Sequence, residues 1–146
     1  MNQQPTISVI IPVYGVEKYI SYFADTLFSQ SYPHLQFVFV NDGTKDSSME
    51  ILQQIVDDKY PHLRPQIVVI NKENGGLPAA RRTGWEHATG DYIYNVDPDD
   101  WLADGALEKM ANKIAETDCD LLCFGMVKVY AKRRSYKHQR SYTAEQ

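Results

Sequence analysis

The sequence predicts an α/β fold of three layers, in which helices cover both faces of a mainly parallel sheet. Two observations predict it. Short, β-branched apolar runs alternate with helix-length segments whose apolar residues recur at spacings of three and four, and the connections between them are short. Strands that alternate with helices in this way are joined by right-handed crossovers and therefore pair in parallel.

The first quarter of the chain contains a strand, a helix and a second strand. Residues 6–13 have few polar breaks, as in a strand that is buried on both faces. The apolar stripe of residues 19–28 predicts a helix, which we expect to end near residues 31–33. The run at 36–40 then predicts the second strand.

A second helix is predicted after the turn at 41–44. Ser47 and Glu50 have the spacing of a capping box, and apolar residues between 49 and 56 share one helix face. Pro61 ends this helix. The remaining expected elements follow in order: a strand at 65–70, a loop at 74–76, a helix with Pro78 in its first turn that Gly90 closes, a strand at 91–96, a helix at 103–116 and an apolar run at 121–124.

The composition is that of an ordinary globular protein. The chain has 146 residues, of which 43% are hydrophobic and 23% charged, which fits about one domain and excludes a disordered or coiled-coil chain. Residues 1–120 carry 9 basic and 18 acidic side chains, whereas residues 121–146 carry 6 and 1. An acidic body lacks the clustered cations of a nucleic-acid groove, so we expect no nucleic-acid partner.

Two further observations concern the compartment. No window approaches 18 consecutive apolar residues, and the chain does not start with a charged segment followed by an apolar one. Cys119 and Cys123 are too few for a disulfide scaffold and lack a second pair for a metal site. We therefore expect a cytoplasmic protein whose two thiols are reduced and buried.

The chemically informative residues follow the predicted strands. The carboxyl ends of parallel strands meet at one edge of the sheet, and ligands bind outside that edge where the strand order reverses. Segments 12–15, 41–43, 71–82 and 97–100 reach it. No glycine-rich dinucleotide or phosphate loop follows the first strand, so a metal ion bridging a pyrophosphate is the simplest way to bind a nucleotide here.

Three carboxylates crowd the last of these segments, at Asp97, Asp99 and Asp100. They would repel one another unless solvent or a divalent cation offsets them, and an all-oxygen set favours Mg²⁺ or Mn²⁺. The alternative is that they cap the helix at 103–116. The excess of acid in the body favours the cation.

Asp42, Gly75 and Arg81 each have two interpretations. Asp42 is either a turn residue or an acceptor for a base N–H. The loop around Gly75 is either a plain flexible turn or a place where the backbone approaches a ligand closely. Arg81 is either a solvated helix charge or a guanidinium offered to a base or phosphate.

Four motifs follow one another along about residues 6–125: SVIIPVY at 8–14, VNDGTKD at 40–46, NGGLPAAR at 74–81 and GDYIYNVDPDDWL at 90–102. Together they resemble the nucleotide-binding half of a family 2 glycosyltransferase, which has a Rossmann-like, three-layer GT-A fold. Each motif is weak alone, but four of them at the ends of the predicted strands are a specific signal.

The resemblance implies that a sugar is transferred, with inversion, from a nucleotide-sugar donor, most often a UDP-sugar, to a saccharide or other hydroxyl acceptor. It implies that Asp42 reads the uracil N–H, that Arg81 lies near the base and that Gly75 lets the chain pass close to it. It also implies that Asp97 sits by the ribose or metal and that Asp99 holds Mn²⁺ or Mg²⁺ on the diphosphate. The residues implied to border the nucleoside are Pro12, Val13, Tyr14 and Glu17.

The carboxylate that deprotonates the acceptor lies, in this family, well beyond the Asp-x-Asp segment. Here 46 residues follow Asp100, and after residue 125 the single acid is Glu145. We therefore expect a chain that is truncated before the acceptor half and has no catalytic base of its own. Gly15, Asn41 and Arg82 stand where the family commonly has Asn, Asp and Asn, which affects the details of nucleoside contact.

We expect residues 1–125 to form the nucleotide-sugar-binding domain and residues 126–146 to form a basic tail or the start of the acceptor-binding part. The tail could contact an anionic membrane, although a solvated tail is the stronger interpretation, and the cut surface could promote oligomers. Two other functions stay open. One is a nucleotide-sugar-binding module without turnover, and the other is a metal-dependent nucleotidyltransferase, whose basic triphosphate loop residues 14–17 do not offer.

Overall fold

The computed structural model describes residues 4–130 and 133–137. The chain divides into two compact units, Met1–Glu116 and Thr117–Gln146, each described by itself below. The sequence predicted a boundary nearer residue 125, and the extent of the nucleotide-sugar-binding domain stays a prediction.

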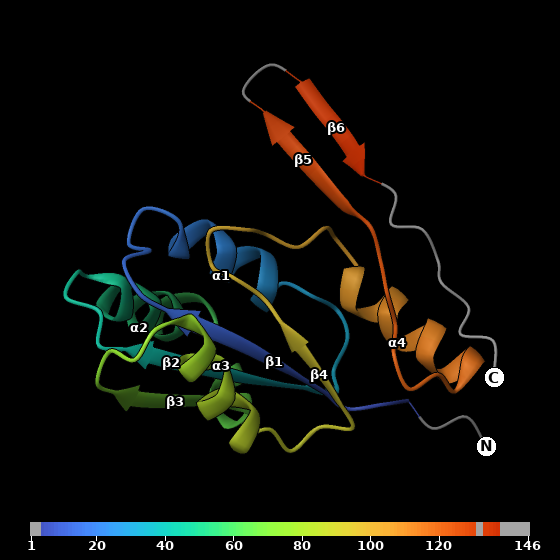
Figure 1. The fold of residues 1–146 in the computed structure, drawn as a ribbon, viewed down its shortest axis with the longest axis horizontal. Coiled ribbons are helices and arrows are strands. Elements are labelled where there is room, and N and C mark those ends of the chain that lie inside the picture. The colour runs from blue at the N-terminus through green and yellow to red at the C-terminus, as the bar shows by residue number, and fades with distance from the viewer. Residues whose placement is uncertain (1–3, 131–132, 138–146) are drawn as a thin grey trace. The chain divides into compact units, whose positions relative to one another are not determined.

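A four-stranded parallel sheet forms the centre of the first unit (Figure 1). Its strands lie in the order β3-β2-β1-β4. The chain builds outward from β1 to β2 and β3 and then returns to place β4 on the other side of β1, so the strand order reverses between β1 and β4. The strands are β1 Ile7–Val13, β2 Leu35–Asp42, β3 Ile67–Lys72 and β4 Tyr92–Asn95.

Helices cover both faces of this sheet, as the sequence predicted. Helices α1, α2 and α4 pack on one face, where Phe23, Phe37 and Phe39 are fully buried in a large core. Burial of each such side chain contributes about 2–3 kcal/mol. Helix α3 covers the other face over a smaller core. The helices are α1 Ile20–Phe28, α2 Ser48–Lys59, α3 Leu77–Glu86 and α4 Ala106–Thr117, and a 3₁₀ helix spans Pro61–Gln66.

Several element boundaries differ from those predicted. Helix α1 ends at Phe28 rather than near residues 31–33, and Pro65 belongs to the 3₁₀ helix rather than to β3. Gly90 does not close α3, which ends at Glu86. Instead, a Cβ at Gly90 would lie 2.8 Å from the backbone nitrogen of Ser8, so this glycine permits a close approach of two backbones.

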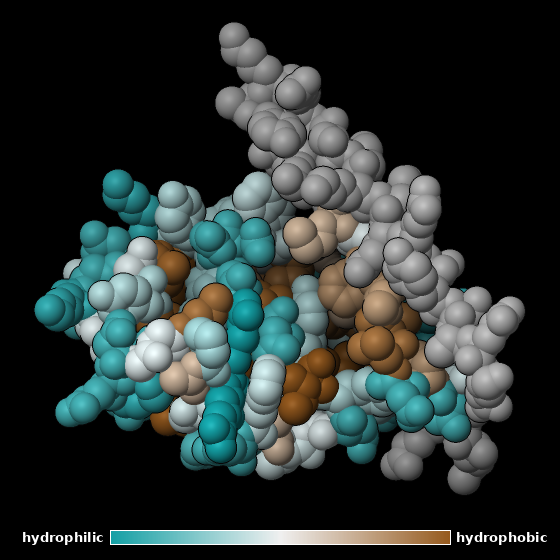
Figure 2. Space-filling model, viewed as in Figure 1, coloured by the Kyte–Doolittle hydropathy of each residue, from teal (hydrophilic) through white to brown (hydrophobic). Residues whose placement is uncertain are grey.

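The face of the sheet that carries α3 is less completely covered than the other. Figure 2 shows hydrophobic side chains beside α3, among atoms that are mostly hydrophilic. Ile93 of β4 is 47% exposed, and Trp85 of α3 is 46% exposed. The Trp85 indole N–H donates to Asn95 Oδ1 at 2.8 Å, which ties α3 to β4.

Helix α3 approaches the sheet most closely at Gly84. A Cβ at this position would lie 2.4 Å from Ile10 Cγ2 and 3.4 Å from Val40 Cγ2. Both neighbours are fully buried in the smaller core. The absence of a side chain at Gly84 therefore sets the distance between α3 and the sheet.

Substitution Gly84→Ala is expected to lower the free energy of unfolding by about 2 kcal/mol, because the added methyl overpacks a core that has no free space. Urea denaturation measures this change. Arg82→Ala, on the exposed side of the same helix, is the matched control and is expected to change stability by less than about 0.5 kcal/mol. Equal stability of the two variants would contradict the close packing of α3.

The second unit contains an antiparallel hairpin of β5, Met126–Tyr130, and β6, Arg133–Lys137. The apolar run at 121–124 forms no strand, and Leu121 is 79% exposed. Both cysteines are free, as predicted, but the prediction that they are buried is wrong, since Cys119 is half-buried and Cys123 exposed.

The predicted tail residues lie partly outside the described residues, and the membrane contact inferred from them stays a prediction. Within the described part of the chain, none of the helices has the length and apolar character needed to cross a membrane.

Candidate functional site

The carboxyl ends of the parallel strands place four loops at one edge of the sheet. Val13 is level with Asn41, and Asn41 with Asn71, so β1, β2 and β3 end together. Beyond β4, the backbone N–H of Val96 donates to the carbonyl of Ile10 at 3.0 Å, which carries the following loop toward the same edge. The predicted convergence of the four segments is therefore confirmed.

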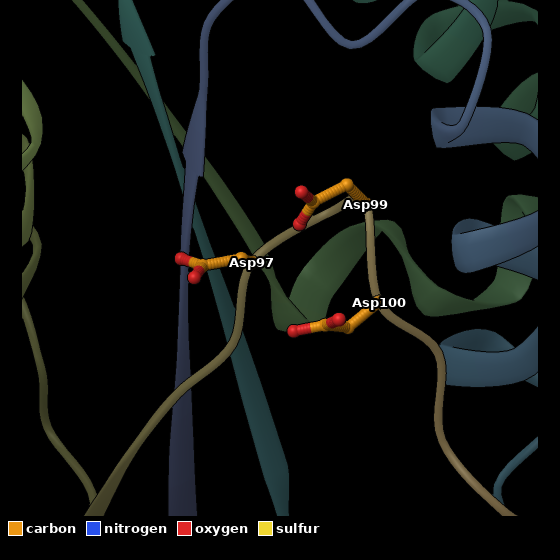
Figure 3. A group of neighbouring side chains, drawn as sticks. All are labelled: Asp97, Asp99 and Asp100. Carbon is orange, nitrogen blue, oxygen red and sulfur yellow. The ribbon is translucent and has the colours of Figure 1, made fainter. Parts of the chain in front are cut away.

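Asp97, Asp99 and Asp100 form a carboxylate cluster, here called the acid loop. One carboxylate oxygen of each lies within 4.8 Å of the others. Figure 3 shows that all three side chains project from the loop toward the same side. The alternative that they cap the next helix is wrong, because α4 begins only at Ala106. The loop closes on itself instead, with the Asp100 N–H donating to the Asp97 carbonyl at 3.0 Å.

The acid loop is electrostatically frustrated. Burial raises the pKa of Asp100, and the neighbouring charges of Asp99 and Asp97 raise it further. Burial and the charge of Asp100 together raise the pKa of Tyr94 on β4 to about 12. Burial is the larger cause of both shifts, and the negative charge of the acid loop adds to it. Oxygen donors that converge within this distance fit a hard divalent cation such as Mg²⁺ or Mn²⁺.

The basic side chain of Arg81 lies beside the acid loop. It projects from α3, and its Nη2 donates to Asp97 Oδ1 at 3.0 Å and to Oδ2 at 3.4 Å. Its Nε is buried and has no hydrogen-bond partner among the residues that the structure describes. Arg82, the next residue, points elsewhere and pairs with Glu86 at 3.6 Å on the helix surface.

Asp42 is buried at the end of β2 and organises the glycine loop. Its Oδ1 accepts from the Gly75 N–H at 2.9 Å and from Lys72 Nζ at 3.0 Å, and its Oδ2 accepts from the Gly76 N–H at 3.1 Å. Burial opposes the charge, but the Gly75 bond, Lys72 and the Gly76 bond hold the pKa of Asp42 below its usual value. Asp42 is thus more than a turn residue, and it fixes the loop that precedes α3.

A second, partly buried network ties the loop after β1 to the start of α2. Asp46 accepts from the hydroxyls of Thr44 at 2.7 Å and Ser48 at 2.6 Å, from the Ser48 N–H at 3.1 Å and from the Glu17 N–H at 3.1 Å. Burial would raise the pKa of Asp46, but these hydrogen bonds, led by that of Ser48, lower it to about 2.

The capping box predicted at Ser47 and Glu50 is wrong. The Ser47 side chain makes no capping bond, and its N–H donates to Glu17 Oε2 at 3.1 Å. The neighbouring Asp46 supplies the acceptor at this helix start. Asp is as good a capping residue as Ser, so its position one residue earlier was the signal that could have found it.

The residues predicted to border a nucleoside lie at this edge, but they differ in whether their side chains are exposed, buried or hydrogen-bonded. Tyr14 is 55% exposed, and its side chain is free to contact a ligand. Val13 is fully buried in the large core, so only its backbone reaches the edge, and Pro12 is also buried. The Glu17 carboxylate is engaged by the Ser47 N–H.

The low pKa of Asp46 predicts a pH-dependent contribution to stability. Because the folded-state pKa is about 2 against an ordinary value of 3.8, the carboxylate stabilises the fold above about pH 4, and this stabilisation is lost as the pH falls toward 2. Asp46→Asn should therefore be less stable than the unmodified chain at pH 6, and the difference should shrink to near zero at pH 2. Urea denaturation at a series of pH values measures it, and a difference that stays constant with pH would contradict the assignment.

Comparison with known proteins places these features in a family. The family described as Glycosyl transferase family 2 matches residues 8–146. Glycosyltransferase GlyA of Streptococcus pneumoniae is 38% identical over 115 residues, which are 79% of this chain and 16% of GlyA. The uncharacterized glycosyltransferase EpsJ of Bacillus subtilis is 35% identical over 132 residues, 90% of this chain and 37% of EpsJ. The chain thus spans well under half the length of either relative.

Solved structures share the fold. TarS 1-349 of S. aureus in complex with UDP-GlcNAc aligns with a TM-score of 0.68 and 27% identity, over 77% of this chain and 32% of TarS. The mannosyltransferase PcManGT of Pyrobaculum calidifontis, in complex with GDP-Man and Mn²⁺, aligns with a TM-score of 0.64 and 23% identity, over 77% of this chain and 32% of its own. The second likeness shows the fold alone.

Proposed function

The chain belongs to glycosyltransferase family 2, and from this premise we propose that it forms the donor-binding part of an inverting hexosyltransferase. The donor is a nucleotide-sugar, specifically a UDP-sugar, and the acceptor is a hydroxyl of a saccharide or similar molecule. The proposal goes beyond the family assignment in naming the nucleotide, the reaction stereochemistry and the need for a divalent cation.

The observation that carries the proposal is the position of the acid loop. Asp97, Asp99 and Asp100 converge where the strand order reverses, which is where open α/β sheets bind ligands. A diphosphate is anionic and would be repelled by this loop alone. A Mg²⁺ or Mn²⁺ ion held by Asp99 and Asp97 would join the two, and when bound it would stabilise the charge on the leaving diphosphate.

The remaining groups at this edge suit a nucleoside. The Tyr14 ring is exposed and able to stack on a base. Among the described residues, Asp42 Oδ2 accepts one hydrogen bond, from the Gly76 N–H, so a second lone pair is available to the uracil N–H that the resemblance assigns to this carboxylate. The complex of S. aureus TarS with UDP-GlcNAc supports a uridine nucleotide as the donor carrier.

We place the general base and the acceptor site in the part of the relatives that this chain does not span. The acids of the described edge are already committed to other contacts. Asp42 and Asp46 each accept three or more hydrogen bonds, and the acid loop is assigned to the cation. A carboxylate with an unoccupied face is still required to deprotonate the acceptor.

Amide chemical-shift mapping with ¹⁵N-labelled chain tests where the nucleotide binds. Addition of UDP with Mg²⁺ should shift the amides of residues 13–15, 42–44, 74–81 and 96–100, and a trace of Mn²⁺ should broaden those of 97–100 first. Residues 61–66, which precede β3 and so lie at the other end of the sheet, should not respond. Shifts confined to other surfaces, or none, would contradict the proposed site.

A further inference from the structure

Arg81 contacts the acid loop directly, although the family resemblance assigns it to the base. Its guanidinium donates to both oxygens of Asp97, at 3.0 and 3.4 Å, which are the oxygens that a cation would need. The Arg81 and Asp97 side chains are 32% and 39% exposed, so water only partly screens the attraction between them. Arg81 therefore already neutralises one of the three clustered carboxylates.

We infer that Arg81 is an internal counter-ion that keeps the acid loop from binding a divalent cation until the nucleotide arrives. The inference rests on the proposed function and concerns the order in which that site fills. A guanidinium on Asp97 acts against a metal ion in two ways. It occupies the lone pairs of one carboxylate, and it repels a second cation placed among the same oxygens.

The unpartnered Nε of Arg81 shows how the restraint is released. This N–H is buried and lacks an acceptor within the described part of the chain, so Asp97 satisfies the guanidinium incompletely. A nucleotide brings phosphate and carbonyl oxygens to this edge, and these oxygens would compete with Asp97 for the guanidinium. Asp97 would then be freed for the cation, which couples cation and nucleotide binding.

The test is a titration of the full chain with Mn²⁺ alone, in which electron paramagnetic resonance measures the concentration of free Mn²⁺. Neutral replacements Arg81→Gln and Arg81→Met are expected to bind Mn²⁺ about tenfold more tightly than the unmodified chain, because they remove a like charge from the acid loop. Arg81→Lys, which keeps the charge, should stay within about threefold of the unmodified chain. Circular dichroism identifies any variant that does not fold.

Arg82→Gln is the matched control, because it removes the same charge from the next residue along the helix. The Arg82 side chain is 80% exposed and pairs with Glu86. It should leave Mn²⁺ affinity unchanged. If the folded neutral Arg81 variants bind Mn²⁺ no more tightly than the unmodified chain, while that chain binds Mn²⁺ with UDP, the counter-ion is refuted and the proposed function stands. If the unmodified chain binds no Mn²⁺ even with UDP, the counter-ion and the cation part of the proposed function both fall.

Discussion

Substitution Asp99→Asn is expected to weaken UDP binding in the presence of Mn²⁺ by about tenfold, and to leave UDP binding in the presence of a chelator unchanged. Asp99 is exposed and its carboxylate faces those of Asp97 and Asp100. Removing one of three anionic donors lowers both the number of ligands and the charge that attracts the cation. Isothermal titration calorimetry of UDP, with Mn²⁺ and with chelator, measures the change.

Asp104→Asn is the control for charge, since Asp104 is an exposed acid shortly after the acid loop that is not part of the cluster. Its UDP affinity should stay within about twofold of the unmodified chain, because an exposed charge outside the cluster is screened by water and salt. An equal loss of affinity in both variants would mean that the general negative field of the loop, rather than coordination by Asp99, controls binding.

Substitution Asp42→Asn is expected to have the largest effect on stability, lowering the free energy of unfolding by about 3 kcal/mol. Asp42 is 3% exposed and accepts from two glycine amides and Lys72. An amide in its place would direct an N–H group at one of these donors. It would also leave the Lys72 ammonium, whose side chain is 22% exposed, without its partner.

Asp57→Asn is the matched control, because Asp57 also forms an ion pair, with Arg64, but at the surface. The Asp57 side chain is 42% exposed and that of Arg64 is 56% exposed. Surface pairs contribute little, so a much smaller loss of stability is expected than for Asp42→Asn. Chemical denaturation of both variants decides between two roles for Asp42. A stable Asp42→Asn chain with weakened UDP binding would mean that the carboxylate serves the nucleotide alone and does not hold the glycine loop.

The sheet and its ligand edge could be predicted from the sequence because their signals are local. The apolar run at 6–13 and Pro78 in the first turn of α3 each determine an element through neighbouring residues. Once four strands alternate with helices, the crossover rule brings their carboxyl ends together. The convergence of Asp42, the glycine loop and the acid loop follows from that rule alone.

The hydrogen-bond partners at this edge could not be predicted in the same way. Arg81 and Asp97 are 16 residues apart and Asp42 and Gly75 are 33 apart, and nothing in the local pattern says which donor meets which carboxylate. Gly90 shows the same limit. Its position after a helix indicates a helix end, whereas its role is a backbone contact with Ser8 that only the folded sheet creates.

The most direct test of a cation-dependent diphosphate site at the acid loop is a calorimetric titration of the unmodified chain with UDP and with uridine, each with Mn²⁺ and with chelator. If the cation joins the acid loop to the diphosphate, Mn²⁺ tightens UDP binding at least about tenfold and leaves uridine binding unchanged. Equal UDP affinity with Mn²⁺ and with chelator, in a chain shown to be folded, would contradict the account.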